Sequence, residues 1–247
     1  MREIPTLLST PMVQATLDGR KSQTRRVKGL DYINESPDQW EFVNTSDKLD
    51  FPRPADCRHP EDPWYLWNDI HNNGKSFISQ CPYGKPGDIL WVRETFYAYG
   101  IWIKNGKTKS GKQAWTFCDT TSSGFKYHYE DKPPESVLPN TTREQYGWFK
   151  RPSIFMPREA CRILLEVTDV RVERLQDISE EDAKAEGAPE SLSIKELEVL
   201  QGMDWMIPSP FLMHQFGFLA IWCKINGQKS WLNNPFVWVI SFRRIQS

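Results

Sequence analysis

Three signatures of secreted and membrane proteins are missing from this sequence. No stretch approaches the roughly 18 consecutive apolar residues of a membrane span. Residues 1–5 combine one basic and one acidic side chain and lead into no apolar signal segment. The five cysteines are widely spaced and form no C-x-x-C pair, which argues against a disulfide framework and for reduced thiols. We therefore expect a cytoplasmic protein with no membrane partner.

An excess of either charge is missing as well. The formal net charge is -1, which excludes a protein that binds nucleic acid through its overall charge. There is no Walker or dinucleotide-binding glycine pattern and no internal repeat. The residues Cys57, His59, His71 and Cys81 lie in one stretch, but their spacing does not match a standard zinc knuckle. We therefore expect no cofactor and no metal.

Positive charge is present locally, near the start of the chain. Residues 1–28 contain six lysines and arginines against two acidic residues, and four of the six lie in residues 19–26, GRKSQTRR. Arginine pairs with phosphate in a forked geometry, and a desolvated lysine can lose its proton and act as a base. This basic element is either an anion or catalytic site or, equally well from its composition, a solvated surface loop.

Residues typical of helix caps, helix ends and turns divide the chain into helices and strands. Thr10, Pro11 and Gly19 suit the cap, the first turn and the end of a short helix. Residues 89–97 and 160–175 are typical of strands that pair with each other. Ser179 opens an acidic helix that ends near Gly187, residues 193–201 and 211–225 are predicted helices, and residues 236–242 are a final strand.

Two stretches lack this order. Residues 29–84 are rich in proline, aspartate and asparagine and are interpreted as an irregular insertion, while residues 100–150 contain hairpin signals with turns at 104–107 and 122–124. Strands and helices do not alternate regularly, which favours an α+β fold with a small mixed β-barrel and rim helices. We expect one domain over residues 1–247 with insertions at about 29–84 and 100–150.

Three motifs in order resemble one known family. Residues 19–26, residues 87–94 (GDILWVRE) and residues 234–242 (NPFVWVISF) are similar to the ASCH domain of the PUA-like superfamily, closest to its longer, prophage-borne members. The resemblance covers about half of the chain and leaves out both insertions. It implies a β-barrel with a cleft that receives RNA, a nucleoside or a nucleotide.

One bacterial branch of this family removes the acetyl group from N4-acetylcytidine. By alignment of the motifs, its catalytic set falls on Lys21, Thr24 and Glu186. The resemblance implies an amidohydrolase in which Lys21 accepts a proton from Thr24 and the Thr24 oxygen attacks the acetyl carbonyl. Glu186 either donates a proton to the leaving N4 or positions the base. Without the resemblance, Glu186 would be read as a solvated carboxylate of an acidic helix and Thr24 as an ordinary strand residue.

Binding of nucleic acid or substrate is predicted for side chains in the three motifs or just before the last of them: Arg20, Arg25, Arg26, Arg93, Glu94, Trp231, Asn233 and Asn234. An ion pair of Arg93 that supports the fold is an equal alternative. We place Trp231 in a loop as a base-stacking residue, and interpret Trp91, Trp238 and His214 as core. Three other functions stay open: a non-catalytic reader of RNA or modified DNA, a ribonuclease, and a structural role in phage assembly.

Overall fold

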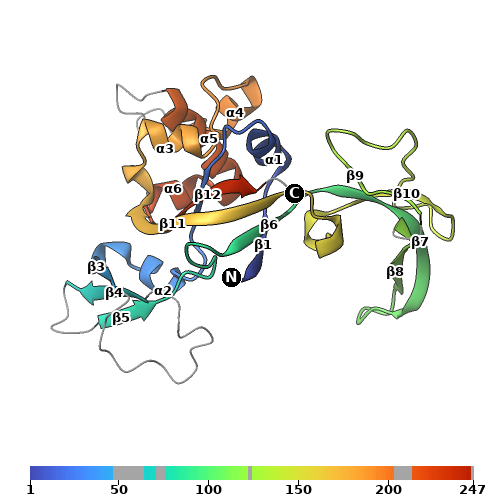
Figure 1. The fold of residues 1–247 in the computed structure, drawn as a ribbon, viewed down its shortest axis with the longest axis horizontal. Helices are drawn as coiled ribbons and strands as arrows, with labels where there is room; N and C mark the ends of the chain where they lie inside the picture. The colour runs from blue at the N-terminus through green and yellow to red at the C-terminus, as the bar shows by residue number, and fades with distance from the viewer. Residues whose placement is uncertain (47–63, 71–75, 122–123, 203–212, 246–247) are drawn as a thin grey trace. The chain divides into compact units, whose positions relative to one another are not determined.

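The computed structural model describes residues 1–46, 64–70, 76–121, 124–202 and 213–245. Contacts between residues divide the chain into two compact units, each assembled from separate stretches (Figure 1). Of the described residues, the first unit contains 1–4, 15–46, 64–70, 76–90, 165–202 and 213–245, and the second contains 5–14, 91–121 and 124–164. No helix of the described residues is long and apolar enough to cross a membrane.

The largest sheet joins strands that are far apart in the sequence. Its order is β1-β6-β11-β12-β2, with β12 antiparallel to β2. The strands are β1 (Glu3–Leu7), β2 (Gln23–Arg26), β6 (Ile89–Arg93), β11 (Leu164–Arg174) and β12 (Phe236–Ile245). The predicted pairing of the strand that begins at residue 89 with the strand near residue 165 is confirmed. The described residues form three sheets and no closed barrel, so the mixed α+β class holds and the expected barrel is not found.

Helices of the first unit pack on this sheet near β12. They are α2 (Asp31–Asn34), α3 (Glu180–Ala185), α4 (Ile194–Val199), α5 (Met213–Asn226) and α6 (Gln228–Leu232), and α1 (Thr10–Leu17) precedes β2. Short 3-10 turns lie at Pro37–Gln39 and Leu175–Asp177. Figure 1 shows α3, α5 and α6 beside β12, and their apolar side chains share one core with Val237 and Val239. Burial of this apolar surface is the main term that stabilises the unit.

Residues 29–84 are more ordered than we expected. Their described part contains an antiparallel sheet of β3 (Trp40–Ser46), β4 (Trp64–Asp69) and β5 (Ser76–Ser79), so the interpretation as an irregular insertion is wrong. Tyr65 and Trp67 are buried, and their rings meet Trp238 and Phe236 edge to face, with centroids 4.5 Å and 4.8 Å apart. Alternate aromatic residues of β4 thus pack on β12.

The second unit is built on a curved sheet of β10-β7-β8, with β9 also paired to β7 (Figure 1). Its strands are β7 (Phe96–Lys107), β8 (Gln113–Asp119), β9 (His128–Tyr129) and β10 (Gly147–Arg151), followed by 3-10 turns at Ser153–Phe155 and Arg158–Ala160. The expected single strand 89–97 is therefore two strands.

The turn of the first predicted hairpin was placed a few residues too early. Residues 104–107 belong to β7, where the register with β8 shifts, and the chain turns at residues 108–112. The lysines and glycine that signalled a turn instead mark an irregular strand end. Of the other predicted turn, residues 122 and 123 lie outside the described residues.

Candidate functional site

The basic element lies where α1 ends and β2 begins. Gly19 has φ 76°, and the amides of Arg20 and Lys21 donate to the carbonyl of Ala15, so the helix closes at the predicted glycine. Lys21 then forms an isolated antiparallel bridge with Glu186 at the end of α3, and the Ser22 amide donates to Ala185 O. Two segments 165 residues apart are thereby joined.

Gly187 permits this close approach. Its φ is 79°, and a Cβ at this position would lie 2.9 Å from the Cβ of Ala15 and 3.2 Å from the Cβ of Lys21. A larger residue would meet both the backbone penalty of the left-handed region and this crowding. The glycine was expected as the stop of an acidic helix, and it also brings Glu186 to Lys21.

The Lys21 ammonium is enclosed by oxygen acceptors. Nζ donates to Glu186 Oε2 at 2.7 Å, to Glu186 O at 2.8 Å and to Gln23 O at 2.7 Å. Only 1% of the Lys21 side chain and 7% of the Glu186 side chain are exposed. The structure therefore brings two of the three predicted catalytic residues into direct contact.

Burial lowers the pKa of Lys21 below the ordinary value of lysine. Desolvation is the largest cause, the attraction and hydrogen bond of Glu186 oppose it, and the charges of Arg26 and Arg25 lower the pKa further. A lysine in such surroundings loses its proton more readily than one in water. This is the property that a general base requires.

Arg25 lies beside the same carboxylate and is fully buried. Its guanidinium pairs with Glu173 and Asp182 at 2.9 Å each and with Glu186 at 3.4 Å. None of the side chain is exposed to solvent. The ring of Phe218 lies 5.7 Å from its charged carbon. The predicted role of Arg25 as an anion contact is wrong for this geometry, because a buried cation that already faces three carboxylates cannot reach phosphate.

Sequence reasoning missed the residues that complete this cluster. Gln23 donates to Asp182 at 3.1 Å and accepts from Arg25 at 2.6 Å, while Arg171 donates to Asp182 at 2.8 Å and also pairs with Glu173. Desolvation raises the pKa of Asp182, but hydrogen bonds and charges from Gln23, Arg25 and Arg171 outweigh it and lower the pKa. The available signal was the strand alternation of Arg171 and Glu173, which places both on one face.

Thr24 points away from the Lys21–Glu186 pair. Gln23 and Arg25 flank it in β2 and face α3, and successive side chains of a strand alternate between faces. Thr24 lies opposite Ile240 in the register with β12, and it is buried. Among the described residues no hydrogen bond joins its hydroxyl to Lys21 or Glu186. The expected proton transfer from Thr24 to Lys21 therefore lacks its geometry.

The other two arginines of the basic element have different surroundings. Arg20 is exposed and pairs with Asp18 at 3.1 Å, a surface ion pair of small energetic weight. Arg26 is half-buried and lies opposite Trp238 in the β2–β12 register. Their predicted role as anion contacts stays a prediction.

Arg93 and Glu94, at the end of β6, make contacts inside the second unit. Glu94 is buried and accepts two hydrogen bonds from Arg162, both 2.9 Å, and Arg162 also pairs with Asp131 at 2.8 Å. The Arg93 guanidinium bonds to the carbonyl of Ile154 and lies over the Trp91 ring. Glu94, rather than Arg93, forms the ion pair that supports the fold, and ligand binding by either residue stays a prediction.

Trp231 is not the stacking residue that we expected. It lies on α6 rather than in a loop, is 4% exposed, and packs in the core next to Phe218. Asn234, with φ 41°, accepts a hydrogen bond from the Gln176 amide at 2.8 Å and thereby shapes the turn into β12. Asn233 is exposed and lines a pocket.

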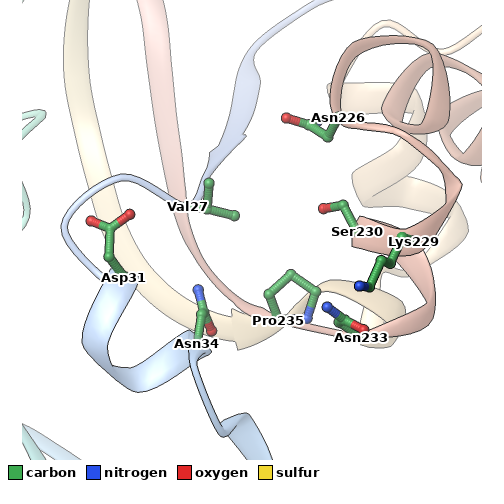
Figure 2. A pocket seen from close by; sticks show the side chains of 8 residues that line it. All are labelled: Val27, Asp31, Asn34, Asn226, Lys229, Ser230, Asn233 and Pro235. Atoms are coloured by element: carbon green, nitrogen blue, oxygen red, sulfur yellow. The ribbon is translucent and has the colours of Figure 1, made fainter.

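The pocket measures about 350 Å³ and lies between α2, the end of β2, and α6 (Figure 2). It is lined by Val27, Asp31, Asn34, Asn226, Lys229, Ser230, Asn233 and Pro235. Asn34 is held by two hydrogen bonds with the backbone of Phe236, at 2.9 Å and 2.8 Å. Within the described ranges the side chains of Lys229 and Asn233 have no ion pair or hydrogen bond, so both are available to a ligand.

Three of the four residues considered for zinc, Cys57, His59 and His71, lie outside the described residues, and the fourth, Cys81, is buried. No group of metal-ligating side chains is found in the described part of the chain. His214 is buried on α5 as expected, with its ring 3.9 Å from Glu180.

Comparisons with protein-family models, with curated proteins and with solved structures gave no match.

Proposed function

We propose that this protein is a nucleoside- or RNA-directed protein of the ASCH type that hydrolyses the acyl amide of N4-acetylcytidine. The observation that carries the proposal is the buried contact of Lys21 with Glu186, with 2.7 Å between Nζ and Oε2. Burial lowers the pKa of this lysine, and the carboxylate holds it in place. In amide hydrolysis one group accepts a proton from the nucleophile and one donates a proton to the leaving nitrogen, and this pair offers both.

Water, rather than Thr24, is the nucleophile in this proposal, because the Thr24 side chain projects from the face of β2 opposite the Lys21–Glu186 pair. The water oxygen bonds to the acetyl carbon while its proton passes to the Lys21–Glu186 pair. The bond from carbon to N4 then breaks, the pair returns the proton to N4, and acetate and cytidine leave. Since three acceptors surround Nζ, the lysine must exchange one of them for water during the reaction.

The test is turnover of N4-acetylcytidine, followed as release of cytidine by chromatography. Lys21→Ala and Glu186→Gln should each lower kcat by about 10² to 10⁴, the usual contribution of a general acid or base. Thr24→Val should keep most of the activity. Lys28→Ala, which changes an exposed lysine close to the element, is the matched control and should leave kcat unchanged.

Absence of turnover by the native protein would refute hydrolysis of this substrate. Unchanged turnover in both Lys21→Ala and Glu186→Gln would refute the assigned residues, and loss of turnover in Thr24→Val would restore the threonine as nucleophile. Circular dichroism of each variant separates a loss of chemistry from a loss of fold.

A second candidate function is supported by the pocket beside α6, which shares no lining residue with the Lys21–Glu186 pair. In it the protein is a non-catalytic reader of a nucleoside or nucleotide. The Asn233 amide offers a donor and an acceptor to a base edge, and Lys229 offers a cation to phosphate. Calorimetric titration with cytidine monophosphate tests this: Asn233→Ala and Lys229→Ala should each weaken binding about tenfold, and equal affinity in all three proteins would refute it.

A further inference from the structure

Aromatic rings gather on one face of the sheet β10-β7-β8 in the second unit. Tyr99 lies opposite Trp148 in the register of β7 with β10, so both side chains project from the same face. The Phe125 ring stacks on Tyr99, with centroids 4.0 Å apart and an angle of 19° between the planes. Tyr146 lies nearly parallel to Tyr99, and His128 meets Trp148 edge to face. The set of Tyr99, Phe125, Tyr146 and Trp148 is called the aromatic face below.

Part of the aromatic face is open to solvent. Phe125 is 46% exposed and Tyr146 is 57% exposed, and Ile103, on the same side of β7, is 47% exposed. The opposite side of this sheet is different, because Phe96 and Ala98 form a small core there with Met156 and Ala160. Contiguous exposed rings are unusual on a protein surface and mark a binding site.

The charge of this unit points to an anionic occupant. Its residues 5–14 and 91–164 contain twelve lysines and arginines against seven aspartates and glutamates, a formal charge of +5 in a chain of net charge -1. Two of the acidic groups near the sheet are already paired, Glu130 with Lys150 and Glu144 with Lys104. Lys107, Lys109 and Lys112, at the turn between β7 and β8, are exposed and form no ion pair with any described residue.

We infer that the aromatic face binds single-stranded nucleic acid, with bases stacked on Phe125, Tyr146 and Tyr99 and the backbone phosphates neutralised by the lysines of the β7–β8 turn. Rings that stack bases together with cations that follow the backbone are the two elements of single-strand recognition. Lys107 lies eight residue steps along β7 from Tyr99, at most about 27 Å at the usual rise. This inference concerns a different unit from the Lys21–Glu186 pair and does not rest on the proposed hydrolysis.

Fluorescence anisotropy with labelled oligouridylate and oligothymidylate of about 12 nucleotides, within the usual site sizes, tests the inference at about 50 mM salt. Phe125→Ala and Tyr146→Ala should each weaken binding by about 5- to 150-fold, the range for loss of one stacked base. A duplex of the same length should bind more weakly than the single strand, because its bases are not free to stack.

Phe155→Ala is the matched control. Phe155 is as exposed as Tyr146, at 57%, but its ring packs against Arg151, which lies on the side of the sheet opposite the aromatic face. This variant should bind like the native protein. Oligonucleotide affinity tests this inference and release of cytidine tests the hydrolysis proposal, so failure of one and failure of the other give different results.

Three results would overturn the inference. The first is absence of native binding to either oligonucleotide at low salt, which would leave the aromatic face to a protein partner. The second is equal affinity of Phe125→Ala, Tyr146→Ala and the native protein, which would reduce any binding to charge alone. The third is tighter binding of the duplex than of the single strand.

Discussion

The cluster beneath α3 and the aromatic face of the second unit use cationic residues in opposite ways. Arg25 is fully buried and its charge is matched by Glu173, Asp182 and Glu186. Lys107 and its neighbours at the β7–β8 turn are exposed and have no carboxylate partner among the described residues. A cation that is enclosed by carboxylates supports a fold or tunes a neighbouring group, whereas a cation without them is available to an outside anion. Composition alone does not distinguish the two cases.

Of the changes considered, removal of the buried Arg25 should have the largest effect on stability. Arg25→Ala leaves three carboxylates near one another without their shared cation, and breaking a buried ion pair in this way costs about 3 to 5 kcal/mol. The free energy of unfolding, measured by urea denaturation, should fall by that amount. Arg20→Ala, at an exposed pair with Asp18, should change it by less than about 1 kcal/mol.

An equal loss in both arginine variants would contradict the assignment of Arg25 to a buried network. So would an Arg25→Ala variant of native stability that lost affinity for phosphate.

Neutralising the exposed lysines of the β7–β8 turn should weaken the salt dependence of oligonucleotide binding. The combined change of Lys107, Lys109 and Lys112 to Gln removes three phosphate contacts. Because each contributes about 0.7 to the salt dependence for a single strand, the slope of log K against log salt concentration should become shallower by about 2. Measurements of oligonucleotide affinity at several salt concentrations give this slope, and the thermal midpoint should stay unchanged. A slope that does not change would place the phosphates elsewhere.

The pH dependence of stability should show the lowered pKa of Lys21. Between this pKa and the ordinary lysine value the unfolded chain binds a proton that the folded chain does not, so stability rises with pH in that window. The free energy of unfolding of the native protein minus that of Lys21→Met should therefore increase from neutral pH toward alkaline pH. A difference that falls instead would mean that Glu186 outweighs desolvation and that Lys21 keeps its proton.

The smallest expected effect is at the turn before β12. Asn234→Gly relieves the left-handed backbone but loses the hydrogen bond from the Gln176 amide, two terms of about 1 kcal/mol that oppose each other. The thermal midpoint should shift by no more than a few degrees. Asn234→Ala, which loses the bond and keeps the strain, should be the less stable of the two. Equal stability would show that the backbone strain is small.

Features that depend on neighbours in the sequence were predicted well. Gly19 ends α1 and Gly187 follows α3, both with positive φ, and the Ser179 hydroxyl accepts from the Asp182 amide as a capping residue should. The predicted alternation of buried and more exposed side chains along β11 is also found in most of the strand. Each of these depends on backbone geometry within a few residues, which local chemistry can specify.

Features that depend on distant packing were predicted poorly. The aromatic residues of β4 looked irregular because their partners, Phe236 and Trp238, lie about 170 residues away in the chain. Trp231 was placed in a loop because the short helix α6 has no cap that the sequence displays. The family resemblance joined Thr24 to Lys21, but the two side chains lie on opposite faces of β2 once β12 fixes the register.

By itself the sequence determined, to within a few residues, where α1, α3, α5 and β12 begin and end, while the family resemblance singled out Lys21 and Glu186. Only the tertiary structure decided that these two meet, that Arg25 is enclosed by carboxylates, and that Phe125 stacks on Tyr99. The physical reason is that caps, turns and alternation are local properties of the backbone, whereas burial and charge pairing depend on which distant segments share a core.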